Sequence, residues 1–110
     1  MSKRKKQIRA AFRDDVFKRD EYRCTICGLK ANKEDPEATL DAHHIVPRVD
    51  MPFGGYVKEN GITLCKAKCH LMAEEFLQGT AFHEGFAPET LYEKIGSDHE
   101  AAKRASSKLA

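Results

Sequence analysis

Residues 24–28 read Cys-Thr-Ile-Cys-Gly, and residues 65–70 read Cys-Lys-Ala-Lys-Cys-His. The cysteines therefore form two short pairs, C-x2-C and C-x3-C, with 37 residues between them. Tetrahedral zinc binds four thiolates at about 2.3 Å, and the fold can supply them as two such pairs. A glycine directly after the first pair eases the turn that aims backbone amides at the sulfurs. The pattern predicts a structural zinc site that ties the first third of the chain to residues 65–69, with the ligands Cys24, Cys27, Cys65 and Cys69.

Other interpretations of the cysteines are buried free thiols, a disulfide pair and a C-x-x-C redox motif. Free thiols would not need this pairing, and the redox motif belongs in a thioredoxin-like βαβ context that is absent here. The N-terminus, MSKRKKQIRA, has no apolar segment after it, so we expect no secretory signal and no oxidising compartment. Zinc binding would add folding free energy to a domain of only 110 residues.

The histidines suggest a second site. His43 and His44 are adjacent at the end of a short predicted strand, and His70 follows Cys69 at the start of a predicted helix. Neighbouring helical residues differ by about 100° in direction, so Cys69 can face the zinc while His70 faces elsewhere. If the strand packs against this helix, one of the paired histidines shares a metal with His70. The other is then free to act as a general base near neutral pH. The alternative is ordinary core or surface histidines.

Hydrophobic spacing and turn residues divide the rest of the chain into short elements. They are a disordered basic arm over 1–6, a helix over 7–19, a knuckle over 22–28, loops over 29–38 and 46–60, strands over 39–45 and 62–64, helices over 69–78 and 88–95, and a polar tail over 97–110 that is helical or frayed. No repeat or linker divides the chain. We therefore expect one α+β domain over 1–110, with its core at about 13–77.

Composition and charge narrow the function classes. With 41% hydrophobic and 33% charged residues, the chain is not collagenous, coiled-coil or wholly disordered. No apolar run approaches the roughly 20 residues of a membrane span, so we expect no membrane partner. The net charge of +2 hides an asymmetry, because residues 1–30 carry +6 and residues 31–110 carry −4. A basic first third suggests a polyanionic partner such as DNA, the alternative being a solvated terminus.

These motifs together resemble the HNH endonuclease family, the ββα-metal or His-Me finger nucleases, in its four-cysteine zinc form. The resemblance implies a small core of two short antiparallel strands and a helix, with a four-cysteine zinc site and flanking helices. The C-x3-C spacing is one residue longer than the commoner C-x2-C. The matching run lies between Arg13 and Phe76 and comprises Val16-Phe17-Lys18-Arg19-Asp20, Cys24-Thr25-Ile26-Cys27-Gly28, Asp41-Ala42-His43-His44-Ile45-Val46-Pro47, Gly54-Gly55, Glu59-Asn60-Gly61-Ile62-Thr63-Leu64-Cys65 and Cys69-His70.

The resemblance assigns roles to four residues. His43 and His70 are similar to the ligands of a catalytic divalent metal, and His44 is similar to the general base that activates water. Asn60 resembles the asparagine that orients the loop and the base, and it can also be an ordinary turn residue before Gly61. The implied reaction is one-metal hydrolysis of DNA phosphodiesters that leaves 5′-phosphate and 3′-hydroxyl ends. The implied metal is Mg²⁺ or Mn²⁺, although imidazoles also suit Ni²⁺, Co²⁺ and Zn²⁺ in a purified sample.

Charged residues near these motifs have two interpretations each. Glu74 lies four residues after His70 on the same helical face. It could be an extra metal ligand or a group that contacts the ligands, but our preferred interpretation is a solvated charge. We expect Arg48 and one nearby lysine, from among Lys58, Lys66 and Lys68, to contact phosphate oxygens, the alternative being solvated surface charge.

Two function classes follow from these patterns. The first is a metal-dependent DNA endonuclease, and the second is a non-catalytic zinc-stapled module that binds nucleic acid. The three histidines favour the nuclease, because a pure zinc module does not need them together. A redox or zinc-storage protein would leave the histidines and the basic terminus unexplained. The resemblance further implies a cytoplasmic, bacterial or phage-encoded protein, with a homodimer or a phage packaging or restriction partner as open alternatives.

Overall fold

The computed structural model describes residues 2–110. Its helices and strands are, in order, α1 (Lys3–Arg19), β1 (Leu40–His44), β2 (Gly61–Cys65), α2 (Cys69–Gln78), α3 (Pro88–Lys94) and α4 (His99–Ser107), with single 3-10 turns at Pro36–Ala38, Arg48–Asp50, Pro52–Gly54 and Lys58–Asn60. The two strands pair antiparallel. The expected α+β class with a ββα core is confirmed, and α2 has the bounds that hydrophobic spacing predicts.

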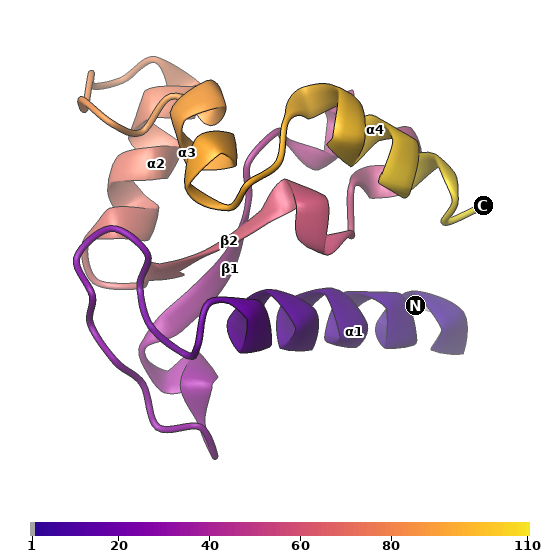
Figure 1. The fold of residues 1–110 in the computed structure, drawn as a ribbon, viewed down its shortest axis with the longest axis horizontal. Coiled ribbons are helices and arrows are strands. Elements are labelled where there is room, and N and C mark those ends of the chain that lie inside the picture. The colour runs from indigo at the N-terminus through magenta and orange to yellow at the C-terminus, as the bar shows by residue number, and fades with distance from the viewer. Residues whose placement is uncertain (1) are drawn as a thin grey trace.

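The two-stranded sheet lies between α1 on one side and the three other helices on the opposite side (Figure 1). The strand register places His43 opposite Ile62 and His44 opposite Gly61. Buried apolar side chains from both sides of the sheet form the core, among them Phe17, Leu40, Ile45, Ile62, Leu64 and Leu91. No helix within residues 2–110 combines the length and apolar character that crossing a bilayer requires.

The basic N-terminal segment is helical. Ser2 caps α1, because its Oγ accepts a hydrogen bond from the Lys5 backbone N–H at 3.2 Å. The expectation of a disordered arm over 1–6 is therefore wrong for residues 3–6, and Met1 lies outside the described residues. With a serine cap and no glycine or proline nearby, nothing in the local sequence stops the helix from starting here.

The C-terminal segment is part of the packed domain. Of the two alternatives for 97–110, the helical one is correct over the span of α4, and Ala102 and Ser106 are fully buried. The guanidinium of Arg4 also donates to the Leu109 carbonyl at 3.0 Å, which joins the start of α1 to the end of α4. Small residues at the buried positions of α4 allow the helix to lie close to its neighbours, so a polar composition is compatible with packing here.

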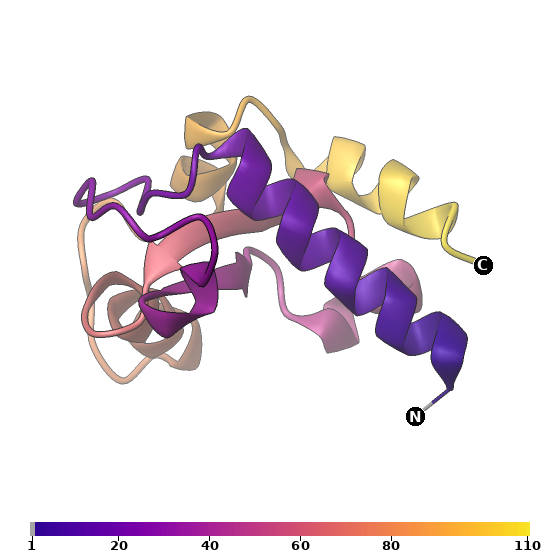
Figure 2. The same ribbon diagram turned by 90° about the horizontal axis from the view of Figure 1, so that it is seen from below.

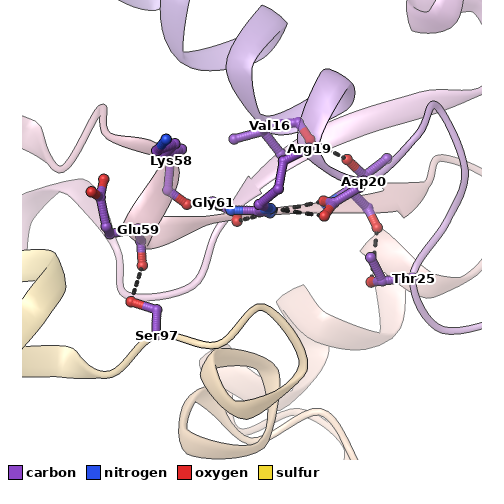
Figure 3. Close-up of polar contacts among 9 residues, drawn as sticks. Val16, Arg19, Asp20, Thr25, Lys58, Glu59, Gly61 and Ser97 are labelled. Carbon is purple, nitrogen blue, oxygen red and sulfur yellow. Dashed lines mark hydrogen bonds and ion pairs between the residues drawn. The ribbon is translucent and has the colours of Figure 1, made fainter.

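Side chains at the end of α1 form hydrogen bonds with backbone groups on the edge of β2 that faces away from β1 (Figure 3). The Asp20 carboxylate accepts from the Thr63 backbone N–H at 2.9 Å, and Arg19 donates to the Gly61 carbonyl at 2.7 Å. Arg19 and Asp20 are themselves paired at 2.8 Å. The Thr63 carbonyl accepts from the Thr25 backbone N–H at 3.0 Å. These bonds fix α1 and the cysteine knuckle against β2.

We expect Asp20→Ala to lower the free energy of unfolding by about 2 kcal/mol, because it leaves the Thr63 N–H without its acceptor and removes the charged partner of the Arg19 guanidinium. Urea unfolding of the metal-loaded protein measures this change. Asp14→Ala is the matched control on the same helix, since its side chain is 75% exposed and a change within about 0.5 kcal/mol is expected. Equal values for the two variants would contradict the role of Asp20.

Candidate metal centre and active site

The structure brings the four cysteines together. One sulfur atom from each lies within 4.8 Å of all the others, and all four are free thiols. The Sγ atoms of Cys27 and Cys65 are 3.8 Å apart. A tetrahedral ion with bonds of about 2.3 Å would hold its sulfurs about 3.8 Å apart, so this spacing fits a thiolate-bound metal. Gly28 adopts φ 79° and donates to the Cys24 carbonyl at 2.9 Å, as the glycine in the turn was expected to allow.

The start of α2 favours a thiolate at Cys65. The Cys69 backbone N–H donates to the Cys65 sulfur at 3.3 Å. Burial raises the pKa of Cys65, but the backbone N–H groups of Cys69 and Lys68 and the nearby thiols outweigh burial and bring that pKa to about 7. A deprotonated sulfur is the form that binds metal, so the protein prepares this ligand before the ion arrives.

A second cluster lies on α2 and β1, next to but separate from the thiols. It consists of His43, His70 and Glu74. One Glu74 oxygen, Oε1, is 3.3 Å from Nδ1 of His43 and 3.2 Å from Nε2 of His70. Atoms that share one divalent ion at about 2.1 Å lie roughly 3.0–3.4 Å apart, so each imidazole nitrogen has the spacing of a common ligand with Glu74 Oε1, and all three ligand atoms lie within 4.8 Å of one another.

The buried ring of His43 supports a metal at this cluster. The side chain is 1% exposed, and neither ring nitrogen makes a hydrogen bond within the described residues, because the Glu74 oxygen 3.3 Å from Nδ1 does not lie in hydrogen-bonding geometry. Burial, together with the charges of His70 and His44, lowers the pKa of His43 to about 3. The ring is therefore neutral at neutral pH, which is the state that donates a lone pair to a metal. An unpartnered buried nitrogen is costly unless a ligand satisfies it.

Asp41 orients the second imidazole. Its Oδ2 accepts from Nδ1 of His70 at 2.7 Å, which leaves the Nε2 lone pair directed toward Glu74. Burial raises the pKa of Asp41, but Lys66 at 2.6 Å and the His70 ring outweigh it and keep that pKa below its ordinary value. The carboxylate therefore stays charged and holds His70 in one tautomer.

Glu74 differs from our preferred interpretation of it as a solvated charge. Its side chain is 43% exposed, but the carboxylate lies between two imidazoles rather than pointing only to water. Two imidazoles and a carboxylate form a ligand set that suits a chemically harder divalent cation than four thiolates do. The donor set and the unpartnered His43 ring thus fit the catalytic metal that the three histidines predict.

His44 lies on the other side of β1 from this cluster. Its ring stacks on Phe12 of α1 at a centroid distance of 4.6 Å, and Tyr56 meets it edge-on at 4.7 Å. Gly61, opposite His44 in the sheet, makes this approach possible, since a Cβ there would lie 2.6 Å from the Phe12 ring. The two adjacent histidines therefore contact different helices, as the alternation of side chains along a strand dictates.

The environment of His44 suits a neutral imidazole. Its Nε2 is buried and has no hydrogen-bond partner among residues 2–110. Burial, together with the nearby guanidinium groups of Arg48 and Arg9, lowers the pKa of His44 to about 4. The ring is consequently unprotonated at neutral pH and able to accept a proton, with two cations nearby.

Asn60 holds the chain that follows His44. Its side-chain oxygen accepts from the Val46 N–H at 3.1 Å, and its amide donates to the Val46 carbonyl at 3.1 Å. The Asn60 carbonyl also accepts from the Ile45 N–H at 2.9 Å. The hydroxyl of Tyr92 donates to the same side-chain oxygen at 2.7 Å. Asn60 is fully buried and positions the backbone beside His44, which exceeds the role of a turn residue.

Arg48 and the two lysines that flank the start of α2, which we considered as phosphate contacts, occupy different settings. Arg48 donates to the Tyr56 hydroxyl at 2.8 Å, close to His44. Lys66 is paired with Asp41, so its charge is already partly neutralised. Lys68 is exposed at the start of α2 and has no ion-pair partner within the described part of the chain. The geometry thus makes Arg48 and Lys68 more available to a polyanion than Lys66.

Three site residues lay outside our assignment of roles. Asp41 carries a sequence signal, because it is two residues before His43 and therefore on the same face of the strand. Phe12 carries no sequence signal for a role in the site, because its spacing indicates only the hydrophobic face of a helix. Tyr92 lies 32 residues after Asn60, so no local pattern could pair the two side chains.

Comparison with known proteins gives one result. The family model described as HNH endonuclease matches residues 24–76, a span that holds both metal clusters, the paired histidines and Asn60. The match confirms the family resemblance, while α1, α3 and α4 lie outside the matched span. No curated protein and no solved structure matches the chain.

We expect the purified protein to contain one zinc ion at the cysteine cluster and to lose its cooperative unfolding transition when a strong chelator removes the ion. The reason is that the metal closes the gap between the two cysteine pairs, so its binding free energy is folding free energy. Elemental analysis and circular dichroism measure both. Restored structure after zinc addition, but not after magnesium addition, completes the test, and a stable metal-free fold would contradict it.

We expect Glu74→Gln to weaken Mn²⁺ binding by at least about tenfold, because it removes a charged oxygen between the two imidazoles. Paramagnetic resonance titration of the zinc-loaded protein measures free Mn²⁺. Glu75→Gln is the matched control on the same helix, since its carboxylate contacts His83 at 2.8 Å rather than the cluster. Unchanged Mn²⁺ affinity in Glu74→Gln would remove this residue from the site.

Proposed function

We propose that this chain, whose residues 24–76 belong to the HNH endonuclease family, is a metal-dependent endonuclease that hydrolyses DNA phosphodiesters. The observation that carries the proposal is a half-buried, neutral imidazole, His44, whose buried Nε2 has no hydrogen-bond partner among the described residues, on the strand that also carries the ligand candidate His43. A module that only binds nucleic acid has no use for His44 in this state, or for a second metal cluster beside the thiols.

His44 acts as the general base. It takes a proton from the attacking water, and the pKa of about 4 ensures that the ring is unprotonated at neutral pH. The negatively charged phosphate then brings charge that offsets Arg48 and Arg9, which raises the proton affinity of the ring when substrate is bound. Phe12 and Tyr56 keep the ring in one plane while it accepts the proton.

His43, His70 and Glu74 would hold the divalent metal, for which we propose Mg²⁺ or Mn²⁺. Such an ion would supply Lewis-acid stabilisation of negative charge at the phosphate. Asp41 keeps His70 in the tautomer that leaves Nε2 free. Tyr92 and Asn60 fix the backbone after the paired histidines, so that base and ligands keep one spacing.

The four cysteines hold zinc in a structural role. Thiolates select a softer ion than the imidazole and carboxylate cluster does, so the two sites can bind different metals in one protein. The products, by family resemblance, carry 5′-phosphate and 3′-hydroxyl ends. Arg48 and the cations of α1 attract the DNA backbone electrostatically, and this attraction weakens as the salt concentration rises.

The decisive variant is His44→Ala. Zinc-loaded protein with added Mg²⁺ or Mn²⁺ is expected to nick or linearise a supercoiled plasmid, and the variant should lose at least about 100-fold in rate, since it lacks the proton acceptor. His44→Gln, which keeps more of the packing against Phe12, should be equally inactive, whereas His83→Ala should cut at the wild-type rate.

Circular dichroism and zinc content confirm that each variant is folded before cleavage is compared. Cleavage by His44→Ala at the wild-type rate would contradict the assignment of the base. A folded, zinc-loaded wild type that binds DNA but cuts nothing with any divalent metal would instead support the non-catalytic binding module.

A further inference from the structure

A groove of about 480 Å³ lies outside the site described so far, between the first half of α1 and the segment after β1. Figure 2 shows this half of α1 running beside the chain that connects β1 to β2. The volume falls within the roughly 300–1,000 Å³ that is typical of ligand sites. Its walls combine aromatic rings with cations, notably Phe53, Tyr56, Arg4, Lys5, Arg9 and Arg48.

The charge of the groove is uncompensated. No carboxylate side chain is among the described residues that line it. None of its four cations has an ion-pair partner within residues 2–110, whereas Arg13, Arg19 and Lys66 each pair with an acid. Arg9 instead lies over the Tyr56 ring at 5.2 Å, and Arg48 donates to its hydroxyl. These cations are therefore available to an anionic ligand, and phosphate groups are the matching chemistry.

Phe53 is an unusual residue for this turn. Its side chain is 62% exposed, and its backbone is in the left-handed region at φ 51°, ψ 27°, which a bulky residue rarely adopts. The turn is held from behind by α4, because Ser106 Oγ bonds to the Pro52 carbonyl and accepts from the Gly55 N–H at 3.0 Å. The fold thus presents an aromatic face to the groove on a fixed support.

An aromatic face beside phosphate-binding cations matches a nucleotide whose base is unstacked. In an intact duplex the faces of the bases are covered by their neighbours, so a protein ring has no face to stack on. An unpaired nucleotide offers both its phosphate and a free base face. This combination recurs wherever proteins bind single strands, with rings for the bases and cations for the backbone.

The groove adjoins the proposed general base. Tyr56 forms part of its wall, and the same ring lies 4.7 Å from the ring of His44. Arg9 also lines both this groove and the hollow that contains His44. A strand that passes His44 can therefore continue directly into the groove.

We propose that the groove binds an unpaired nucleotide of the DNA strand next to the phosphodiester that is cut, with Phe53 stacked on its base and Arg9 and Arg48 on phosphate oxygens. The inference rests on the proposed nuclease function and narrows its substrate class. The preferred substrate has a single-stranded segment, such as a flap, a gap or an open junction, beside the cut.

The test measures binding by fluorescence anisotropy, with zinc-loaded protein that carries His44→Gln in every sample so that no strand is cut. The probes are a labelled DNA single strand of about 12 nucleotides, the duplex of the same sequence and the matching RNA strand. Phe53→Ala should weaken binding of the DNA single strand roughly 5- to 100-fold and binding of the duplex less than about twofold. Phe53→Trp should bind like the parent, because it keeps the stacking face.

Phe82→Ala is the matched control, since Phe82 is also exposed, at 79%, but packs near Phe76 away from the groove. Unchanged single-strand affinity in Phe53→Ala, or an equal loss on the duplex, would overturn the groove assignment even if the wild type cuts plasmids. A selective effect of Phe53 without any plasmid cleavage would support the groove and refute the nuclease. Tighter, Phe53-dependent binding of the RNA strand would overturn the assignment to DNA.

Discussion

The convergence of two cysteine pairs that are 37 residues apart in the sequence is the constraint on which the rest of the structure depends. Because Cys65 ends β2 and Cys69 begins α2, a metal held by both fixes the junction between strand and helix. The same ion would also bind Cys24 and Cys27 and thereby hold the end of α1, where Asp20 bonds to the free edge of β2. A domain of this size has little core to spare, so a metal cross-link of this kind contributes a large share of its stability.

That junction also explains how two clusters of metal-ligating residues with different chemistry lie on one helix. Cys69 and His70 are consecutive, and the turn of the helix sends the first toward the thiols and the second toward β1. There, alternation along the strand directs Asp41 and His43 to α2 and His44 to α1. The period of a single strand thus places the candidate metal ligands and the proposed base, His44, on opposite sides of β1. Asn60, buried and held by Tyr92, keeps the chain after that strand in place.

Spacing within the sequence predicts those parts of the site that are local. The cysteine pairs, the strand with the two histidines and the start of α2 can all be read from patterns a few residues long. Glu74 was given less weight because a helical glutamate is ordinarily solvated, and only the approach of His43 from β1 makes it a ligand candidate. Tyr92, the groove and the packing of α4 depend on contacts between distant segments, which composition does not encode. The helical start of α1 was missed because its charge suggested disorder, although Ser2 is a good helix cap.

The central claim is that a thiolate-bound zinc supports a separate divalent site formed by imidazoles and a carboxylate. Anomalous diffraction from crystals grown with Mn²⁺ tests this most directly, because zinc and manganese absorb at different X-ray energies. The account predicts zinc among the sulfurs of Cys24, Cys27, Cys65 and Cys69, and manganese bound by His43, His70 and Glu74. Manganese that binds elsewhere, or an empty histidine cluster in crystals that hold both metals in solution, would contradict it.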